Sequence, residues 1–280
     1  MSDTWTVGRL LDWTTPFFQK KGLDSPRLDA ELLLAYVLCC PRINLYTGFD
    51  RVLEESELAA FRALVQRRAK LEPVAYLVGS QGFHEIELKV DRRVLVPRSE
   101  TELLVEVAAK RAPATVLDIG TGSGAIVLAL LHMQHTLVGV ATDASADAIS
   151  VAQDNARRLG LESRVQFRVG EFYAPVKGQR FAMIVSNPPY IARGDARLEE
   201  GVALHEPEQA LYAERDGLAA LETIVRGASA HLEASGALAV ECGAGQADAV
   251  AAMMRLGGLT SVVIHPDLAG IARVVEAQLA

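Results

Sequence analysis

The chain has 280 residues, of which 50% are hydrophobic and 22% are charged, and its formal net charge is −7. This length is enough for one large domain or two, and an acidic chain is a poor candidate for binding a nucleic-acid backbone. Its three cysteines fit neither zinc-ligand spacing nor a disulfide framework, so no metal site is predicted. The sequence shows no signal peptide and no apolar run of the ~18 residues that span a membrane, which predicts a soluble cytoplasmic protein.

Residues 1–75 are predicted to form a small helical bundle. Apolar side chains fall near one helical face between Val7 and Phe18. A second helix is expected to open at Ser25 and Pro26, and a third near Ser56. The bundle carries no catalytic constellation of its own. Its expected role is therefore to hold or recognise a partner of the protein.

Residues 76–97 are predicted to form a β-hairpin linker. Apolar and charged residues alternate over residues 86–90, which is the period of a half-buried strand. Gly79 and Gly82 suggest the turn of the hairpin before this strand.

Residues 98–280 are predicted to form an α/β domain with a doubly wound sheet. Ser99 and Glu102 form a capping-box pattern where its first helix is expected to begin. Strands and helices then alternate, which is typical of this architecture. The expected strands cover residues 115–119, 137–142, 165–169, 181–186, 237–241, 261–264 and 274–277.

A glycine-rich loop follows the first strand of this domain. The loop consists of Gly120, Thr121, Gly122, Ser123 and Gly124. Together with Ala125 it satisfies the fingerprint of adenosine-cofactor sites, in which glycines let the ligand approach the backbone closely. Asp143 ends the second strand, where a carboxylate can bind ribose hydroxyls. A dinucleotide and S-adenosylmethionine (SAM) are both compatible with this loop, because the two use similar geometry.

Two further features extend the predicted cofactor site. Asp118 places a carboxylate beside the loop, which suits a cationic ligand such as SAM. Glu171 and Phe172 follow the third strand and offer an acid and an aromatic ring that could hold adenine. Plain packing in the core is the alternative interpretation of Phe172, since large aromatic side chains usually pack.

The stretch Asn187-Pro188-Pro189-Tyr190 ends the apolar strand at residues 181–186 and also favours SAM. Pro188 and Pro189 have no N–H, so the loop is rich in hydrogen-bond acceptors. The Asn187 side-chain oxygen and nearby carbonyls could accept both protons of an –NH2 group, with the flat ring of Tyr190 beside them. A hydride-transfer enzyme has no need of such a receptor. A structural turn is the simpler alternative, because Asn-Pro is ordinary turn chemistry.

Together these motifs resemble the HemK/PrmC family of protein-(glutamine-N5) methyltransferases, which act on peptide chain release factors. The resemblance covers nearly the whole chain. It implies a helical N-terminal domain that helps to bind the release factor, a hairpin linker, and a Rossmann-like, SAM-dependent catalytic domain. Two residues depart from the family pattern: Ser99 replaces the usual proline, and Phe172 stands where some members carry tryptophan. Further matching segments lie at residues 25–33, 73–77, 94–102, 206–207 and 267–270.

The resemblance also implies a site. SAM contacts are expected at residues 120–124, Asp143, Phe172 and Asn187, and contacts to the substrate glutamine at residues 187–190. The implied reaction moves a methyl group from SAM to the amide N5 of the glutamine in the GGQ motif of class 1 release factors. Asn187, Pro188 and Tyr190 are the expected catalytic residues.

Three other functions stay open on the sequence. A glutamine methyltransferase for a ribosomal protein belongs to the same family, and an N6-adenine nucleic-acid methyltransferase would use the same receptor for an –NH2 group. The second would require a basic target-recognition region, and none is visible, so no direct nucleic-acid partner is expected. A module that only binds an adenosine nucleotide is the third alternative.

Overall fold

The computed structural model describes residues 4–280. Met1, Ser2 and Asp3, which begin the segment without a signal-peptide pattern, lie outside the described residues. The chain divides into two compact units: Met1–Gly79 with Glu199–His205, and Ser80–Leu198 with Glu206–Ala280. From residue 4 onward, no helix has the length and apolar character needed to cross a membrane.

The first unit is a bundle of short helices, which confirms the helical character predicted for the N-terminal part of the chain. Phe18 and Leu33 are fully buried at its centre. An ion pair between Arg68 and Asp29, 2.8 Å apart, joins two of the helices. The helices of this unit are α1 (Val7–Lys20), α2 (Pro26–Val37), α3 (Ile43–Thr47), α4 (Glu55–Arg68), α5 (Val74–Val78) and α9 (Glu200–His205).

The second unit contains all the described strands. They are β1 (Ser80–Phe83), β2 (Ile86–Lys89), β3 (Thr115–Ile119), β4 (Val138–Asp143), β5 (Val165–Val169), β6 (Phe181–Ser186), β7 (Leu232–Glu241), β8 (Leu259–Pro266) and β9 (Ala272–Leu279). Seven of them form one sheet in the order β5-β4-β3-β6-β7-β9-β8. The first five in this order are parallel, and β9 is antiparallel to both of its neighbours. The predicted doubly wound α/β architecture is confirmed.

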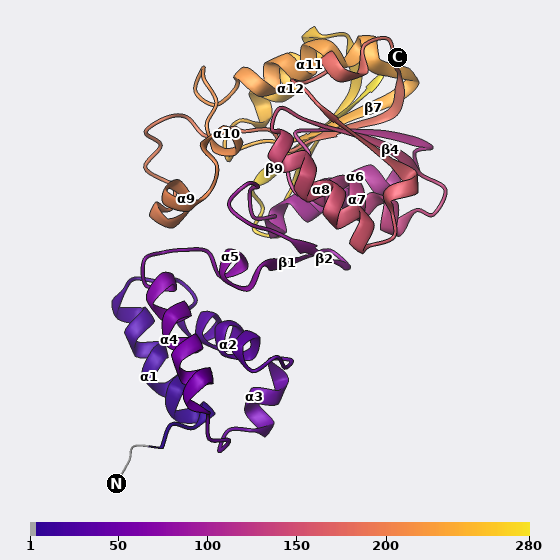
Figure 1. Ribbon diagram of the computed structural model, residues 1–280. Coiled ribbons are helices and arrows are strands. Elements are labelled where there is room, and N and C mark those ends of the chain that lie inside the picture. The colour runs from indigo at the N-terminus through magenta and orange to yellow at the C-terminus, as the bar shows by residue number, and fades with distance from the viewer. Residues whose placement is uncertain (1–3) are drawn as a thin grey trace. The chain divides into compact units, whose positions relative to one another are not determined.

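Helices cover both faces of this sheet. They are α6 (Glu102–Lys110), α7 (Ala125–Met133), α8 (Ala146–Arg158), α11 (Ala219–His231) and α12 (Ala247–Leu256), while the short helix α10 (Glu208–Leu211) lies in the segment between β6 and α11. Figure 1 shows α6, α7 and α8 along one side of the sheet and α11 and α12 along the other. Helix α7 is apolar all round, with every residue from Ala125 to Leu131 buried, because it lies between the sheet and its neighbouring helices.

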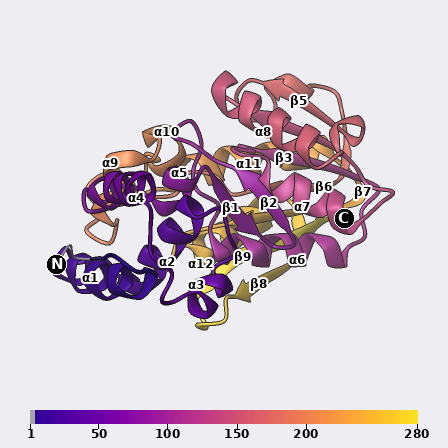
Figure 2. The same ribbon diagram turned by 60° about the horizontal axis from the view of Figure 1, so that its bottom comes forward.

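Strands β1 and β2 pair as the predicted hairpin (Figure 2), but the predicted turn position is wrong. The chain turns at His84 and Glu85, and His84 has a φ of 52°. Gly79 instead ends α5 in a left-handed conformation with a φ of 77°, which is the usual place of a helix-ending glycine. Gly82 lies inside β1.

The predicted capping box at Ser99 and Glu102 is also wrong. Residues Ser99–Thr101 form a 3₁₀ turn, η1, before α6. The Ser99 hydroxyl donates to the Glu100 carboxylate at 3.0 Å, and the Glu102 carboxylate accepts a hydrogen bond from the His84 N–H at 2.8 Å. Glu102 therefore ties the hairpin turn to the start of α6 instead of capping its own helix.

The direction of winding reverses between β3 and β6. The chain passes from β3 to β4 and β5 on one side, then returns to β6 on the other side of β3. Ile119 pairs with Ser186, so Gly120 and Asn187 begin their loops at the same level of the sheet. Open α/β sheets bind ligands at such a switch point, outside the carboxyl ends of the strands.

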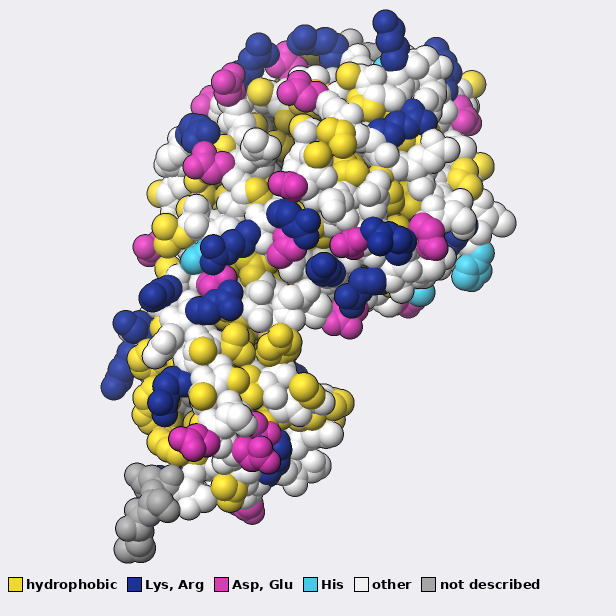
Figure 3. Space-filling model, in the orientation of Figure 1, with side chains coloured by type: hydrophobic (Ala, Val, Ile, Leu, Met, Phe, Trp, Pro, Cys, Tyr) yellow, Lys and Arg dark blue, Asp and Glu magenta, His cyan; other side chains and the backbone are white. Residues whose placement is uncertain are grey.

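Charged side chains of both signs share the molecular surface. Figure 3 shows Lys and Arg interspersed with Asp and Glu on the face that it presents. It also shows hydrophobic side chains on the surface of the helical first unit. Large apolar side chains of this unit that are at least half exposed include Trp13, Tyr36, Ile43, Tyr46 and Val52.

Candidate active site

A cavity of about 290 Å³ lies at the switch point of the sheet. Loops that follow β3, β4, β5 and β6 all contribute to its lining. The structure therefore brings together residues that the sequence placed on four separate loops. The predicted site residues that line the cavity are Gly120, Gly122, Asp143, Phe172, Asn187, Pro188 and Pro189.

The first two glycines of the loop present bare backbone to the cavity. Gly120 and Gly122 have φ values of +72° and +55°, a region that side chains of L-residues rarely adopt. A Cβ atom added to either glycine would meet no atom within 4 Å. The backbone at these two positions is thus an open cradle that a ligand can approach closely.

Three other predicted loop residues do not line this cavity. The Thr121 hydroxyl donates to Asp118 at 2.7 Å, and the Ser123 side chain is buried. At Gly124 a Cβ atom would lie 2.8 Å from the Leu128 side chain, so the glycine is needed where the loop packs on α7. Their contact with a cofactor stays a prediction, and their visible role is to shape the loop.

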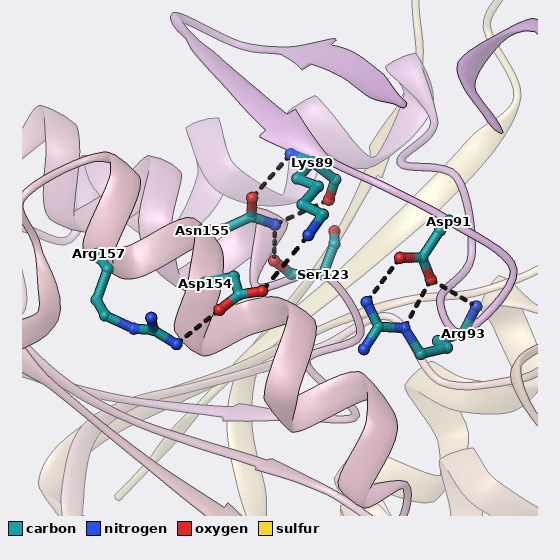
Figure 4. Close-up of polar contacts among 7 residues, drawn as sticks. All are labelled: Lys89, Asp91, Arg93, Ser123, Asp154, Asn155 and Arg157. Atoms are coloured by element: carbon teal, nitrogen blue, oxygen red, sulfur yellow. Dashed lines mark hydrogen bonds and ion pairs between the residues drawn. The ribbon is translucent and has the colours of Figure 1, made fainter. Parts of the chain in front are cut away.

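Asn155 on α8 holds the loop from behind (Figure 4). Its Nδ2 donates to the carbonyls of Ser123, at 2.9 Å, and Lys89, at 3.0 Å. Its Oδ1 accepts from the Lys89 N–H at 2.7 Å. One buried side chain thereby joins the glycine loop to strand β2. Sequence reasoning missed Asn155 because its partners lie 32 and 66 residues away along the chain.

Two carboxylates lie at the ends of neighbouring strands beside the loop. Asp118, on β3, is fully buried, and this burial raises its pKa to about 7. Asp143, on β4, lines the cavity and accepts hydrogen bonds from the N–H groups of Gly122 and Ser145, both at 2.9 Å. Burial raises the pKa of Asp143, and these two hydrogen bonds act in the opposite direction. The backbone thus fixes the Asp143 carboxylate at the rim of the open cradle.

Glu171 and Phe172 line the same cavity after β5. Phe172 has a φ of 47°, which is unusual for a residue other than glycine. The ring is partly buried against the core below. Phe172 therefore both packs and borders the cavity, so the two interpretations from sequence are compatible.

Asn187 is held by Thr101, a residue of the family-like segment at residues 94–102 whose contact with Asn187 was not predicted. Its Nδ2 donates to the Thr101 hydroxyl oxygen at 3.0 Å, which turns the Oδ1 atom to the opposite side of the amide. Pro188 and Pro189 follow in the cavity lining and offer carbonyl groups but no N–H. Tyr190 is not part of the lining; its hydroxyl donates to Glu241 at 3.0 Å.

Another buried carboxylate, Glu206, holds together two segments that line the cavity. Glu206 accepts a hydrogen bond from the Val96 N–H at 2.9 Å and pairs with Arg98 at 2.6 Å. The residues next to these, Leu95 and Pro207, line the cavity. The family resemblance covered both the motif at residues 206–207 and the segment at residues 94–102, but the contact between the two was not predicted.

Known proteins show the same organisation. A family model described as the PrmC N-terminal domain matches residues 9–79, and one described as the methyltransferase small domain matches residues 99–206. The release factor glutamine methyltransferase of Geobacter sulfurreducens is 43% identical over 99% of this chain and 98% of its own length. That of Rhodopirellula baltica is 42% identical over 99% and 97%. The solved catalytic domain of hMettl16, in complex with the MAT2A 3′UTR hairpin 6, has a TM-score of 0.55 at 14% identity, over 82% of this chain and 85% of that one.

The fold and the cavity at its switch point define a Rossmann-like methyltransferase of the SAM-dependent class. Within that class the relatives share nearly the full length of the chain, including its helical first unit. The chain belongs to the HemK/PrmC family of release factor glutamine methyltransferases, which confirms the resemblance in its sequence motifs.

Proposed function

We propose that this protein transfers a methyl group from SAM to the side-chain amide N5 of the GGQ glutamine in class 1 peptide chain release factors. The observation that carries the proposal is the acceptor-rich loop at the end of β6, in which Thr101 fixes the amide of Asn187. The names of the full-length relatives support the same substrate. The proposed compartment is the cytoplasm, where peptide chains are released.

The cavity has the features that SAM requires. The open backbone at Gly120 and Gly122 leaves room for a ligand, and the fixed carboxylate of Asp143 can accept hydrogen bonds from ribose hydroxyls. Phe172 offers a flat ring for adenine at the end of β5. The backbone of Thr121, Ser123 and Gly124 completes the proposed loop. When bound there, SAM supplies an electrophilic methyl group on a sulfonium.

The residues after β6 are proposed to act on the amide nitrogen of the substrate, which must attack the methyl group. Its lone pair is delocalised into the carbonyl, so it is a poor nucleophile. In the proposed mechanism the Asn187 Oδ1 and the Pro188 carbonyl accept hydrogen bonds from the two N–H bonds of the substrate amide. These hydrogen bonds orient the nitrogen and stabilise the positive charge that develops on it. Fixed acceptors and positioning together supply most of the reduction in barrier. Tyr190 packs beside the glutamine, and one amide proton leaves to water.

Each segment has one proposed role. Residues 1–75 recognise the substrate protein, residues 76–97 link the two domains, and residues 98–280 catalyse the methyl transfer. Support for the first role comes from the surface of the helical unit. Trp13 is 53% exposed and Ile43 is 67% exposed. Several exposed large apolar side chains on one small unit are typical of a surface that binds another protein.

Removing the helical unit should separate cofactor binding from activity. A chain that starts at Pro73 is expected to bind SAM, because every lining residue of the cavity lies beyond that point, and to lose methylation of intact release factor. Calorimetry and methyl-transfer assays measure the two properties. Full-length Ile43→Asp is the companion variant, because its exposed site tolerates a charge, and it should raise KM for release factor at unchanged SAM affinity. Full activity of the truncated chain would show that the unit is dispensable.

The activity itself is tested by incubating the purified chain with methyl-labelled SAM and purified release factors, followed by peptide mass mapping. Label is expected on one peptide, at the GGQ glutamine, and a release factor with that glutamine changed to alanine should stay unlabelled. Label in a ribosomal-protein glutamine or in an adenine base would instead support one of the two rival substrates. SAM binding without any transfer would leave only the role of a binding module.

The charge of the chain gives little support to the alternative function of a nucleic-acid methyltransferase. The chain carries 28 Lys and Arg against 35 Asp and Glu, and the two signs are interspersed on the face shown in Figure 3. Binding along a phosphate backbone normally requires a basic patch or stripe. Protein therefore remains the better proposed partner.

A further inference from the structure

Glu241 is a buried carboxylate beside the Asn187 loop for which the proposed function gives no role. It is the last residue of β7 and is only 1% exposed. Strands β6 and β7 are parallel neighbours, and Ser186 pairs with Val240. Asn187, which directly follows β6, and Glu241, which ends β7, therefore lie at the same level of the sheet.

Two hydroxyl groups converge on this carboxylate. The Tyr190 hydroxyl donates to Glu241 Oε1 at 3.0 Å. Burial raises the pKa of Glu241, and the neighbouring Thr101 hydroxyl, which is 3% exposed, acts in the opposite direction as a hydrogen-bonding group. The other carboxylate atom, Oε2, has no hydrogen-bond partner among residues 4–280. Arg273 attracts the charge of the carboxylate, and Glu100 repels it.

The direction of the hydrogen bonds among Glu241, Thr101 and Asn187 determines which end of the Asn187 amide faces Thr101. A carboxylate oxygen accepts, so the single hydroxyl proton of Thr101 is directed to Glu241. The lone pairs of Thr101 Oγ1 are then left to accept the hydrogen bond from Asn187 Nδ2, at 3.0 Å. A reversed Asn187 amide would place its Oδ1 against an oxygen that has no second proton to give. The reversed orientation is thereby disfavoured.

We propose that Glu241 is a positioning residue that fixes the amide of Asn187 through Thr101 and holds the ring of Tyr190 through its hydroxyl. This inference rests on the proposed function, because it assigns Asn187 Oδ1 as the acceptor for the substrate amide. Glu241 lies outside the cavity lining and acts only through its two partners. Glu241 accepts and cannot donate when ionised, so it determines the direction of the hydrogen bonds from Asn187 to Thr101 and from Thr101 to Glu241.

The test compares kcat, KM and SAM affinity among full-length variants on release factor. Glu241→Leu removes the acceptor at similar size and is expected to lower kcat by about 10²-fold, in the range for loss of a preorganised polar group. KM and SAM affinity should change by less than about threefold. Glu241→Gln keeps one acceptor oxygen and should recover part of kcat. Thr101→Val should resemble Glu241→Leu, whereas Thr101→Ser should keep most of the turnover.

A double variant distinguishes positioning from general damage. If Glu241 acts through Thr101, the combination of Glu241→Leu and Thr101→Val should lose little more turnover than either single variant. The side-chain amide signals of Asn187 in an NMR spectrum should move in both single variants, without any substrate present. Unchanged kcat in Glu241→Leu, multiplicative losses in the double variant, or unmoved amide signals would each overturn the inference. A wild-type chain that fails to methylate release factor would instead refute the proposed function.

Discussion

Replacing Asn187 with alanine is expected to lower turnover on release factor by about 10²–10³-fold, the usual cost of removing one preorganised polar group at a reacting centre. The substitution removes the Oδ1 acceptor while leaving Pro188 and Pro189 to shape the loop. SAM affinity and thermal stability should stay near those of the wild type, because the side chain has one described hydrogen bond, to Thr101. The measurement is single-turnover transfer of labelled methyl at saturating SAM.

Asn187→Asp is the sharper version of this experiment. Aspartate keeps the size and an acceptor oxygen, but it loses the Nδ2 donor that anchors the side chain to Thr101. It also adds negative charge near the position proposed for the sulfonium, which should favour cofactor binding. The variant is therefore expected to bind SAM at least as well as the wild type and to methylate glutamine poorly. If Asn187→Ala retains near-wild-type turnover, the amide clamp is wrong and the Asn-Pro turn is only structural.

The second large effect is expected on cofactor binding. Asp143→Ala should weaken SAM binding by about ten- to a hundredfold, since charge-assisted hydrogen bonds of this kind contribute roughly 1.5–3 kcal/mol. The structure adds a second reason. Asp143 also accepts hydrogen bonds from the N–H groups of Gly122 and Ser145, so it helps to fix the glycine loop. Isothermal calorimetry measures the affinity directly.

A matched variant separates these two reasons. Asp143→Asn keeps one acceptor oxygen for the loop but loses the charge, so a smaller loss of SAM affinity is expected than with alanine. Denaturation of each variant without ligand reports how much the loop contacts contribute to stability. Unchanged SAM affinity in Asp143→Ala would remove this residue from the proposed site.

The sequence was sufficient to predict how the cavity is assembled. Strands β3, β4 and β6 are mostly apolar, β5 alternates apolar and polar residues, and each strand ends at a polar residue or is followed by a glycine, so their limits were visible. In a doubly wound sheet the carboxyl ends of parallel strands meet at one edge. Gly120, Asp143, Phe172 and Asn187 could therefore be expected to lie together before the structure was known.

The supporting contacts could not be predicted, because they join positions far apart in the chain. Thr101 and Asn187 are 86 residues apart, and Tyr190 and Glu241 are 51 apart. The same cause explains the failed capping box. Ser99 and Glu102 have the local pattern, but the N–H of His84, 18 residues before Glu102, takes the carboxylate instead. Local motifs describe which bonds are available, and tertiary packing decides which ones form.

Asn155 anchors the glycine loop, which its glycines alone would leave mobile. Glycines at Gly120 and Gly122 make a segment that is easily displaced, because their backbone has many accessible conformations. The Asn155 amide bonds Ser123 and both backbone groups of Lys89 at once. Opening the loop at Ser123 or strand β2 at Lys89 therefore breaks hydrogen bonds of the same side chain, which couples the two local openings.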